Sequence, residues 1–388
     1  MLSSLKKIES NRFAPLAISL VSGLLLGILQ QTPFVFVGLI GFLWLEELLD
    51  AKLGKNASFW LWGYTALGFA CWNAFTTFWM LSEVGGLAPV FWLGNALLMA
   101  IPLVLFQVTK KEVAKLGYFT LLCYWLTFEY LHSQWAIAWP WLNLSNSLAS
   151  SPLFSDWFSI TGALGGSAWL LLLAVAFYRI LFKKKPVFGL LVLEIFPFAI
   201  GLFVTSPSSP QEMEGQLMKG GEVLMINSNR VPLRFPGVRE VSYPFLYLKN
   251  TPESLAEGRT AEVDSLQVVL LSGYEPLFTE TAASHLSGQQ GFFVVKNSPN
   301  TLSQSLGYLK LLSLMTQRPL ISFTPQQTFL VNTDGSVDKF YEGESFLFDT
   351  NSSTTFFTKN GEYLGRVAVF FALLIFLSSW VKDKIKKR

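Results

Sequence analysis

The feature that most limits how this chain can fold is a series of long apolar runs. A transmembrane helix needs about 20 apolar residues. Since 51% of the 388 residues are apolar and only 14% are charged, a soluble protein of this composition would lack the charge to cover its surface. We therefore expect a polytopic α-helical membrane bundle of about eight transmembrane helices. The runs lie at 13–30, 34–49, 58–80, 88–108, 117–131, 160–181, 186–205 and 364–381.

The positions of lysine and arginine predict the orientation of this bundle, because basic residues near helix ends stay on the cytosolic side. With a cytosolic N-terminus, the loops on the outer side are 31–33, 81–87 and 132–159, and none of them contains Lys or Arg. Both termini are then cytosolic. A bacterial inner membrane is the expected location, with the polar stretch before the last apolar run on the periplasmic side.

The polar stretch differs in character from the rest of the chain. Short strand-like runs such as 267–271 and 291–295 alternate with Pro, Gly, Asn and Ser, as in a folded α/β domain. The predicted organisation is a bundle at 1–208, a periplasmic domain at 215–360, and a last helix with a basic tail at 362–388. The sequence Ser206 to Pro210 is the expected linker.

Several kinds of site are not expected from this composition. The cysteines, Cys71 and Cys123, both fall inside apolar runs, which argues against a disulfide framework or a cysteine-based metal site. The histidines, His132 and His285, are too few for a zinc site. We predict no metal, no cofactor and no nucleic-acid partner, since the net charge of +3 is small.

Polar and aromatic side chains gather at the longest outer loop. Such aromatics are often only the interfacial belt of a membrane protein. A carboxylate beside them also suits binding of a lipid or a partner. The candidate binding residues here are Glu129, His132, Trp135, Trp139 and Trp141. Glu194, inside the seventh run, is either a helix-to-helix hydrogen-bonding residue or faces a wet cavity.

Four stretches of the sequence carry recognisable motifs. They are Leu20 to Gly27, then Glu129 to His132 with Pro140 to Ser145, then Arg318 to Ile321, and Asp334 to Val337. In this order and membrane context they resemble the apolipoprotein N-acyltransferase family, whose members move an acyl chain from phospholipid to the N-terminal cysteine of bacterial lipoproteins. In the second stretch His132 stands where the family usually has Arg.

This resemblance implies an external nitrilase-like αββα domain, shortened here, with a Glu–Lys–Cys triad in the family. In that triad the cysteine is the nucleophile, the glutamate takes its proton and the lysine stabilises the charge on the carbonyl oxygen. Glu253 matches the family's glutamate, and Gly273 occupies the place of the cysteine, followed by Tyr274 and Glu275. The interval between Glu253 and Gly273 is too short for the loop that carries the lysine.

A substitute nucleophile is difficult to find in the sequence. Ser272 precedes Gly273, yet a serine hydroxyl needs a positioned base, and a shift of one residue turns a strand side chain to the opposite face. Lys249 and Lys296 are the available lysines near the motif. Tyr274 and Glu275 are therefore grouped with the lipid-binding or partner-binding candidates.

We predict a catalytically inactive relative of the family that binds phospholipid or lipoprotein and docks with a partner protein in an envelope complex. The first alternative is an active phospholipid-to-lipoprotein N-acyltransferase with an altered site based on Glu253. The second is a transporter-like protein, which has less support because Glu194 and Glu129 are the ionisable residues that we identify within the helices.

Overall fold

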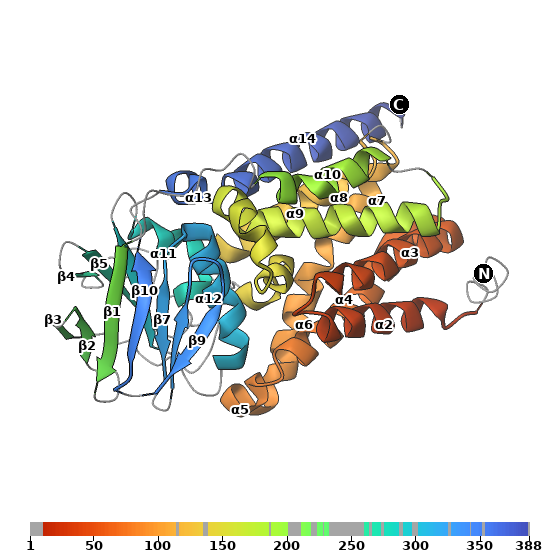
Figure 1. The fold of residues 1–388 in the computed structure, drawn as a ribbon. Coiled ribbons are helices and arrows are strands. Elements are labelled where there is room, and N and C mark those ends of the chain that lie inside the picture. The colour runs from red at the N-terminus through yellow and green to blue at the C-terminus, as the bar shows by residue number, and fades with distance from the viewer. Residues whose placement is uncertain are drawn as a thin grey trace.

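The chain is described by a computed structural model that covers residues 11–113, 116–134, 139–185, 188–200, 211–218, 223–227, 229–232, 260–263, 266–272, 275–286, 290–296, 302–324, 327–341, 343–350 and 354–386. Helices occupy every apolar run that the sequence predicts (Figure 1). They are α2 (Ala14–Ile28), α3 (Phe36–Leu53), α4 (Ala57–Thr76), α5 (Met80–Val84), α6 (Ala88–Met99), α7 (Ile101–Lys110), α8 (Phe119–Gln134), α9 (Ser155–Leu181), α10 (Phe188–Ile200) and α14 (Tyr363–Lys386).

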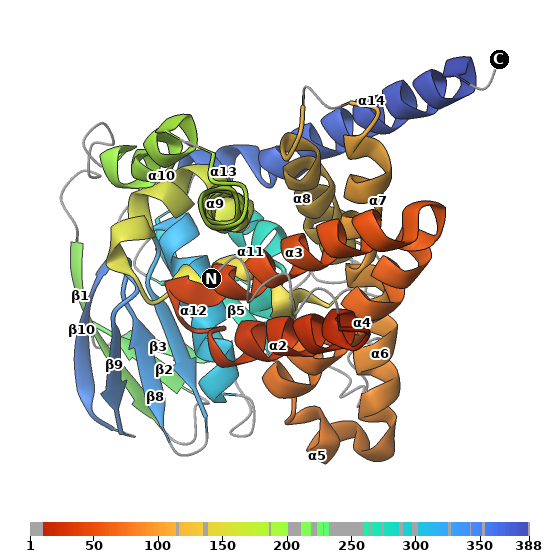
Figure 2. The same ribbon diagram turned by 90° about the vertical axis from the view of Figure 1, so that its right-hand side faces the viewer.

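Three segments of the described chain are long and apolar enough to cross a membrane: Gly85–Lys110, Ser155–Leu181 and Tyr363–Ile385. Several other helices at the predicted positions are shorter than the ~20 residues that a span needs; α2 has 15 residues and α8 has 16. Figure 2 shows α14 extending beyond its neighbours, and its side chains are largely exposed. The chain is therefore a membrane protein, and the count of eight spans stays a prediction.

Small residues allow α2 to pack closely against both α3 and α4. Gly23 on α2 faces Gly68 on α4 so closely that a Cβ atom at Gly23 would lie 1.9 Å from the Gly68 carbonyl oxygen. Toward α3, the Ser22 hydroxyl lies 2.0 Å from the Cβ position of Gly41. Close approach at small residues is the usual means by which membrane helices gain packing contacts. One face of the Leu20 to Gly27 motif therefore forms the contacts of α2 with α3 and α4, while Val21 and Leu24 on the other face are exposed.

The region that the sequence predicts to be external, for which we keep the name external domain, contains two β-sheets. The first has the order β10-β1-β2-β3 and the second has the order β4-β5-β6-β7-β8-β9. Strands β5, β6 and β7 run parallel, whereas the other pairs are antiparallel. The strands are β1 (Gln211–Met218), β2 (Val223–Ile226), β3 (Asn229–Pro232), β4 (Thr260–Val263), β5 (Leu266–Ser272), β6 (Gly291–Lys296), β7 (Leu320–Phe323), β8 (Thr328–Val331), β9 (Val337–Phe340) and β10 (Ser345–Thr350).

Because strand β1 pairs with β10 from Gln211 onward, this domain begins before residue 215, the boundary predicted from the sequence. The predicted linker Ser206 to Pro210 lies outside the described residues.

Two apolar layers hold the sheets and their helices together. Val268 and Phe292 point between the sheets, where they meet residues such as Phe348 from β10. Their sequence neighbours, Val269 and Phe293, point to the other face of the six-stranded sheet, as strand alternation requires. There they contact α11 (Thr279–Ser284) and α12 (Leu302–Thr316). These helices lie between the six-stranded sheet and the membrane bundle (Figure 1).

The external domain packs directly on the bundle through α12. Tyr308, Leu311 and Leu314 belong to the same apolar core as the bundle residues. The Tyr308 hydroxyl donates to the Trp141 carbonyl, and Gln317 Nε2 donates to Ser155 Oγ at 2.9 Å. Burial of these apolar side chains stabilises the contact between the external domain and the bundle in proportion to the apolar area removed from water. The two parts of the described chain thus form one packed unit.

Candidate functional site

Glu129 lies on α8 and fixes the loop that follows the helix. Its Oε1 accepts hydrogen bonds from Trp125 Nε1 at 2.9 Å and from the Leu144 backbone N–H at 3.3 Å. Its Oε2 is buried and has no hydrogen-bond partner among the described residues. The neighbouring Ser167 hydroxyl donates its one proton to Asn143 Oδ1 at 2.9 Å. Glu129 therefore holds the motif Pro140 to Ser145 on the bundle.

The aromatic side chains of this loop point inward. Trp139 and Trp141 are 3% and 5% exposed, and their rings meet edge to face with centroids 5.1 Å apart. Trp141 also contacts Trp79 from the segment before α5. The two indoles thus form part of the apolar core under the external domain. Trp135 lies outside the described residues, and its binding role stays a prediction.

His132 belongs to a buried polar network that joins three helices. Its Nε2 lies 2.8 Å from Asn95 Oδ1 on α6, and Asn95 Nδ2 donates to Asn73 Oδ1 on α4 at 2.8 Å. Because Asn95 Oδ1 is an acceptor, His132 Nε2 carries the proton in this contact. The ring stacks on Phe128 with centroids 4.8 Å apart. His132 thus links α4, α6 and α8 at the end of the bundle that faces the external domain.

The place that the resemblance assigns to the family's nucleophile follows the carboxyl end of β5 in the sequence. Ser272 is the last residue of that strand, and its backbone is paired in register with Lys296, the last residue of β6. The Lys296 side chain is exposed. Gly273, Tyr274 and Glu253 lie outside the described residues. Glu275 begins a short 3-10 helix, Glu275–Leu277, and is half-buried.

A carboxylate next to this strand end contacts the start of the last helix. Glu280 lies on α11, which follows the Glu275–Leu277 turn. Its Oε1 accepts from the Glu362 backbone N–H and from Arg366 Nη1, each at 3.3 Å. Glu362 is itself 7% exposed, and its Oε2 has no hydrogen-bond partner among the described residues. No local sequence pattern marks Glu280 and Glu362 as partners, because they are 82 positions apart.

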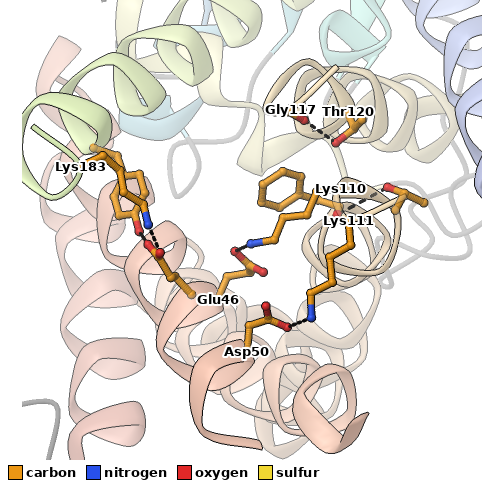
Figure 3. Close-up of polar contacts among 11 residues, drawn as sticks. Glu46, Asp50, Lys110, Lys111, Gly117, Thr120 and Lys183 are labelled. Atoms are coloured by element: carbon orange, nitrogen blue, oxygen red, sulfur yellow. Dashed lines mark hydrogen bonds and ion pairs between the residues drawn. The ribbon is translucent and has the colours of Figure 1, made fainter. Parts of the chain in front are cut away.

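Acidic and basic side chains also pair at the opposite end of the bundle (Figure 3). Glu46 Oε2 on α3 lies 2.5 Å from Lys110 Nζ on α7, and Asp50 Oδ1 lies 2.7 Å from Lys111 Nζ. Glu47, between them in sequence, pairs with Lys183 after α9. These residues correct the expectation that Glu194 and Glu129 are the ionisable groups within the helices. Charge on α3 is balanced by the lysines of neighbouring elements.

Comparison with known families bears on the membrane bundle. Residues 19–176 match the family model for the apolipoprotein N-acyltransferase N-terminal domain. The membrane bundle therefore matches the N-terminal domain of the apolipoprotein N-acyltransferase family. The matched residues run from α2 to α9 and include the close packing at Gly23, the Glu129 contacts and the buried network at His132. No curated protein matches the chain.

The described side chains do not form a metal site. Within the ranges that the structure covers, no group of three or more His, Cys, Asp or Glu residues is arranged to hold a metal ion. Cys123 is buried in the bundle and Cys71 is partly buried there. The side chain of Glu194 lies outside the described set, so the two interpretations of that residue stay open.

Proposed function

We propose that this member of the apolipoprotein N-acyltransferase family is an inner-membrane binding protein without acyltransferase activity. The observation that supports this most directly is that glycine, Gly273, occupies the position of the family's nucleophilic cysteine. Glycine has no side-chain nucleophile, and covalent acyl transfer requires one. The only cysteines of the sequence belong to helices of the bundle, remote from β5.

The proposed ligand is a phospholipid or the diacylated end of a lipoprotein, held at the external end of the bundle. The proposed external domain is a shortened nitrilase-like fold, which the two sheets facing each other and the helical layer on one of them support. In this proposal the loop that contains Trp135 contacts the ligand and Glu129 holds the base of that loop. A partner protein of an envelope complex is proposed to dock on the same end.

Acyl transfer is the direct test of this proposal. Purified protein in lipid nanodiscs, given phospholipid donor and a diacylated lipopeptide, is expected to form no triacylated product above protein-free nanodiscs. Glu253→Ala and Ser272→Ala should match the wild type, because no nucleophile is lost. Product formation that Glu253→Ala abolishes would contradict the proposal and would show a rebuilt active site.

Lipopeptide binding is the second measurement. We expect the wild type in nanodiscs to bind a fluorescent diacylated lipopeptide, and Trp135→Ala to weaken binding by ~10-fold or more, the usual effect of removing an aromatic anchor. Trp60→Ala is the matched control, because Trp60 is an exposed tryptophan in the first turn of α4, outside the loop that contains Trp135. Equal loss in both variants would mean that the tryptophans act through general lipid contact.

An altered acyltransferase is the second candidate function, and one observation favours it. The register of β5 and β6 pairs Ser272 with Lys296, so a hydroxyl and an ammonium group belong to neighbouring strand ends. In this alternative Ser272 is the nucleophile and Lys296 stabilises the oxyanion. Lys296→Met would then reduce turnover together with Ser272→Ala, whereas Lys339→Met, on β9, would not.

A further inference from the structure

The junction of α11, α13 (Phe356–Asn360) and α14 contains a carboxyl group in an unusual setting. The Glu362 side chain lies where α9 bends at Gly162, a residue with φ of 65° inside the helix. A Cβ atom at Gly162 would be 3.4 Å from Glu362 Oε2 and 2.7 Å from the Phe357 ring. Glu362 is therefore enclosed between the bundle helix α9 and the external domain.

The same residue anchors the external domain through its backbone. Glu280 Oε1 accepts from the Glu362 N–H and pairs with Arg366, while Arg366 Nη2 donates to the Asn360 carbonyl. The preceding residue, Gly361, has a φ of 57°, and a Cβ there would lie 2.0 Å from Glu280 Oε1. Thus α11 contacts the turn before α14 at a distance that only glycine permits.

The charges around Glu362 are mostly of its own sign. Glu280 faces it from α11, Glu129 from α8, and Arg366 and Tyr363 from α14. The groups that face it from α9 and α13, Gly162 and Phe357, are uncharged. Burial, and after it the charges of Glu280 and Glu129, raises the pKa of Glu362 to about 8, against an opposing effect of Arg366. At neutral pH the enclosed group therefore holds a proton.

We propose that Glu362 is a proton-dependent latch. While its carboxyl group is protonated, the external domain stays docked on the bundle, and loss of that proton at higher pH loosens the contact. Opening the junction exposes the carboxyl group to water, where it loses its proton near the ordinary Glu value of about 4.3. Between about pH 4.3 and 8 the closed junction holds one proton more than the open one, so rising pH favours opening. Above about pH 8 both states are ionised, and the dependence ends.

Hydrogen exchange of the full-length protein in lipid nanodiscs tests the latch. After correction for intrinsic exchange rates, the opening of α11 and of the first turn of α14 should increase by up to ~10-fold per pH unit from pH 5 to 8 and then level off. The amides of α2 serve as the internal reference. Wild-type opening that is independent of pH across this range would overturn the proposal.

Three variants separate protonation from simple packing. Glu362→Gln keeps the shape of the protonated group and should flatten the pH profile at the protected level. Gly361→Ala disturbs the Glu280 contact without changing charge, so opening should increase at every pH with the wild-type slope. Glu212→Gln, which alters an exposed carboxylate on β1, should leave the profile unchanged. A wild-type slope in Glu362→Gln would assign the pH dependence to another group and reject the latch.

Discussion

Gly23→Ala is expected to lower the thermal stability of the purified protein more than almost any other single methyl addition. The new Cβ would lie 1.9 Å from the Gly68 carbonyl oxygen, and that contact is with backbone. Relief therefore requires α2 and α4 to separate, which removes the contacts of both helices around it. Insertion into a well-packed core costs about 1–3 kcal/mol, and a clash with rigid backbone belongs at or above the upper end of that range.

The neighbouring geometry makes this interface hard to adjust. The Ser19 hydroxyl, one turn earlier on α2, donates to the Tyr64 carbonyl of α4. On α4 itself, a Cβ at Gly68 would be 2.6 Å from the Ser19 carbonyl oxygen. A movement that accommodates Ala at position 23 therefore also stretches the contact at Ser19.

The melting temperature in detergent or nanodiscs measures the effect, and α4 provides the control. Gly63 lies on the same helix with no atom within 4 Å of its Cβ position. Gly63→Ala should be neutral or stabilising, since alanine is favoured over glycine in helices by about 1 kcal/mol. Equal melting temperatures for Gly23→Ala and Gly63→Ala would contradict the packing described for the family motif.

Lys110→Met is expected to destabilise the protein strongly, while Lys111→Met should have little effect. Lys110 pairs with Glu46, whose side chain is 3% exposed, and its removal leaves a buried carboxylate without its partner. Loss of one member of a buried pair typically costs about 3–5 kcal/mol. Lys110 is itself 24% exposed, so the lower end of that range is expected.

The adjacent pair is the matched comparison. Lys111 and Asp50 have side-chain exposures of 56% and 21%, and pairs of this kind contribute about 0–1 kcal/mol. Chemical unfolding of both variants, and of the double variant Glu46→Gln with Lys110→Met, separates the pair from its surroundings. The double variant should recover part of the stability lost in Lys110→Met. If Lys110→Met and Lys111→Met behave alike, the burial of Glu46 is not what determines the cost.

The positions of the helices and of several strands follow from the sequence for a simple reason. Apolar runs and alternating residues are local patterns, and the energy of burying them decides which segments become helices or strands. The helices α2, α9 and α14 and the strands β5 and β6 lie close to the places that the sequence predicts. The family resemblance carried by the motif Leu20 to Gly27 is confirmed for the bundle, because residues 19–176 match the family model.

The roles of particular side chains depended on contacts between distant segments. Sequence patterns placed Trp139 and Trp141 at a membrane boundary, but the packing of α12 over this loop puts both indoles in the core. Likewise, the sequence places Glu46 inside an apolar run and gives no sign of its partner, because Lys110 is 64 residues away. Local periodicity carries no information on such pairs.

The sequence by itself determined a membrane chain whose bundle matches the apolipoprotein N-acyltransferase N-terminal domain. It also predicts an external α/β domain with glycine at the position of the nucleophile. Composition, hydrophobic period and sequence motifs are properties of short segments, so they do not depend on how distant parts of the chain pack. Only the tertiary structure decided that Ser272 and Lys296 are register partners and that Glu362 is enclosed between α9 and α11. Those facts arise because folding brings together residues far apart in the chain and removes them from water, which changes what each group can do.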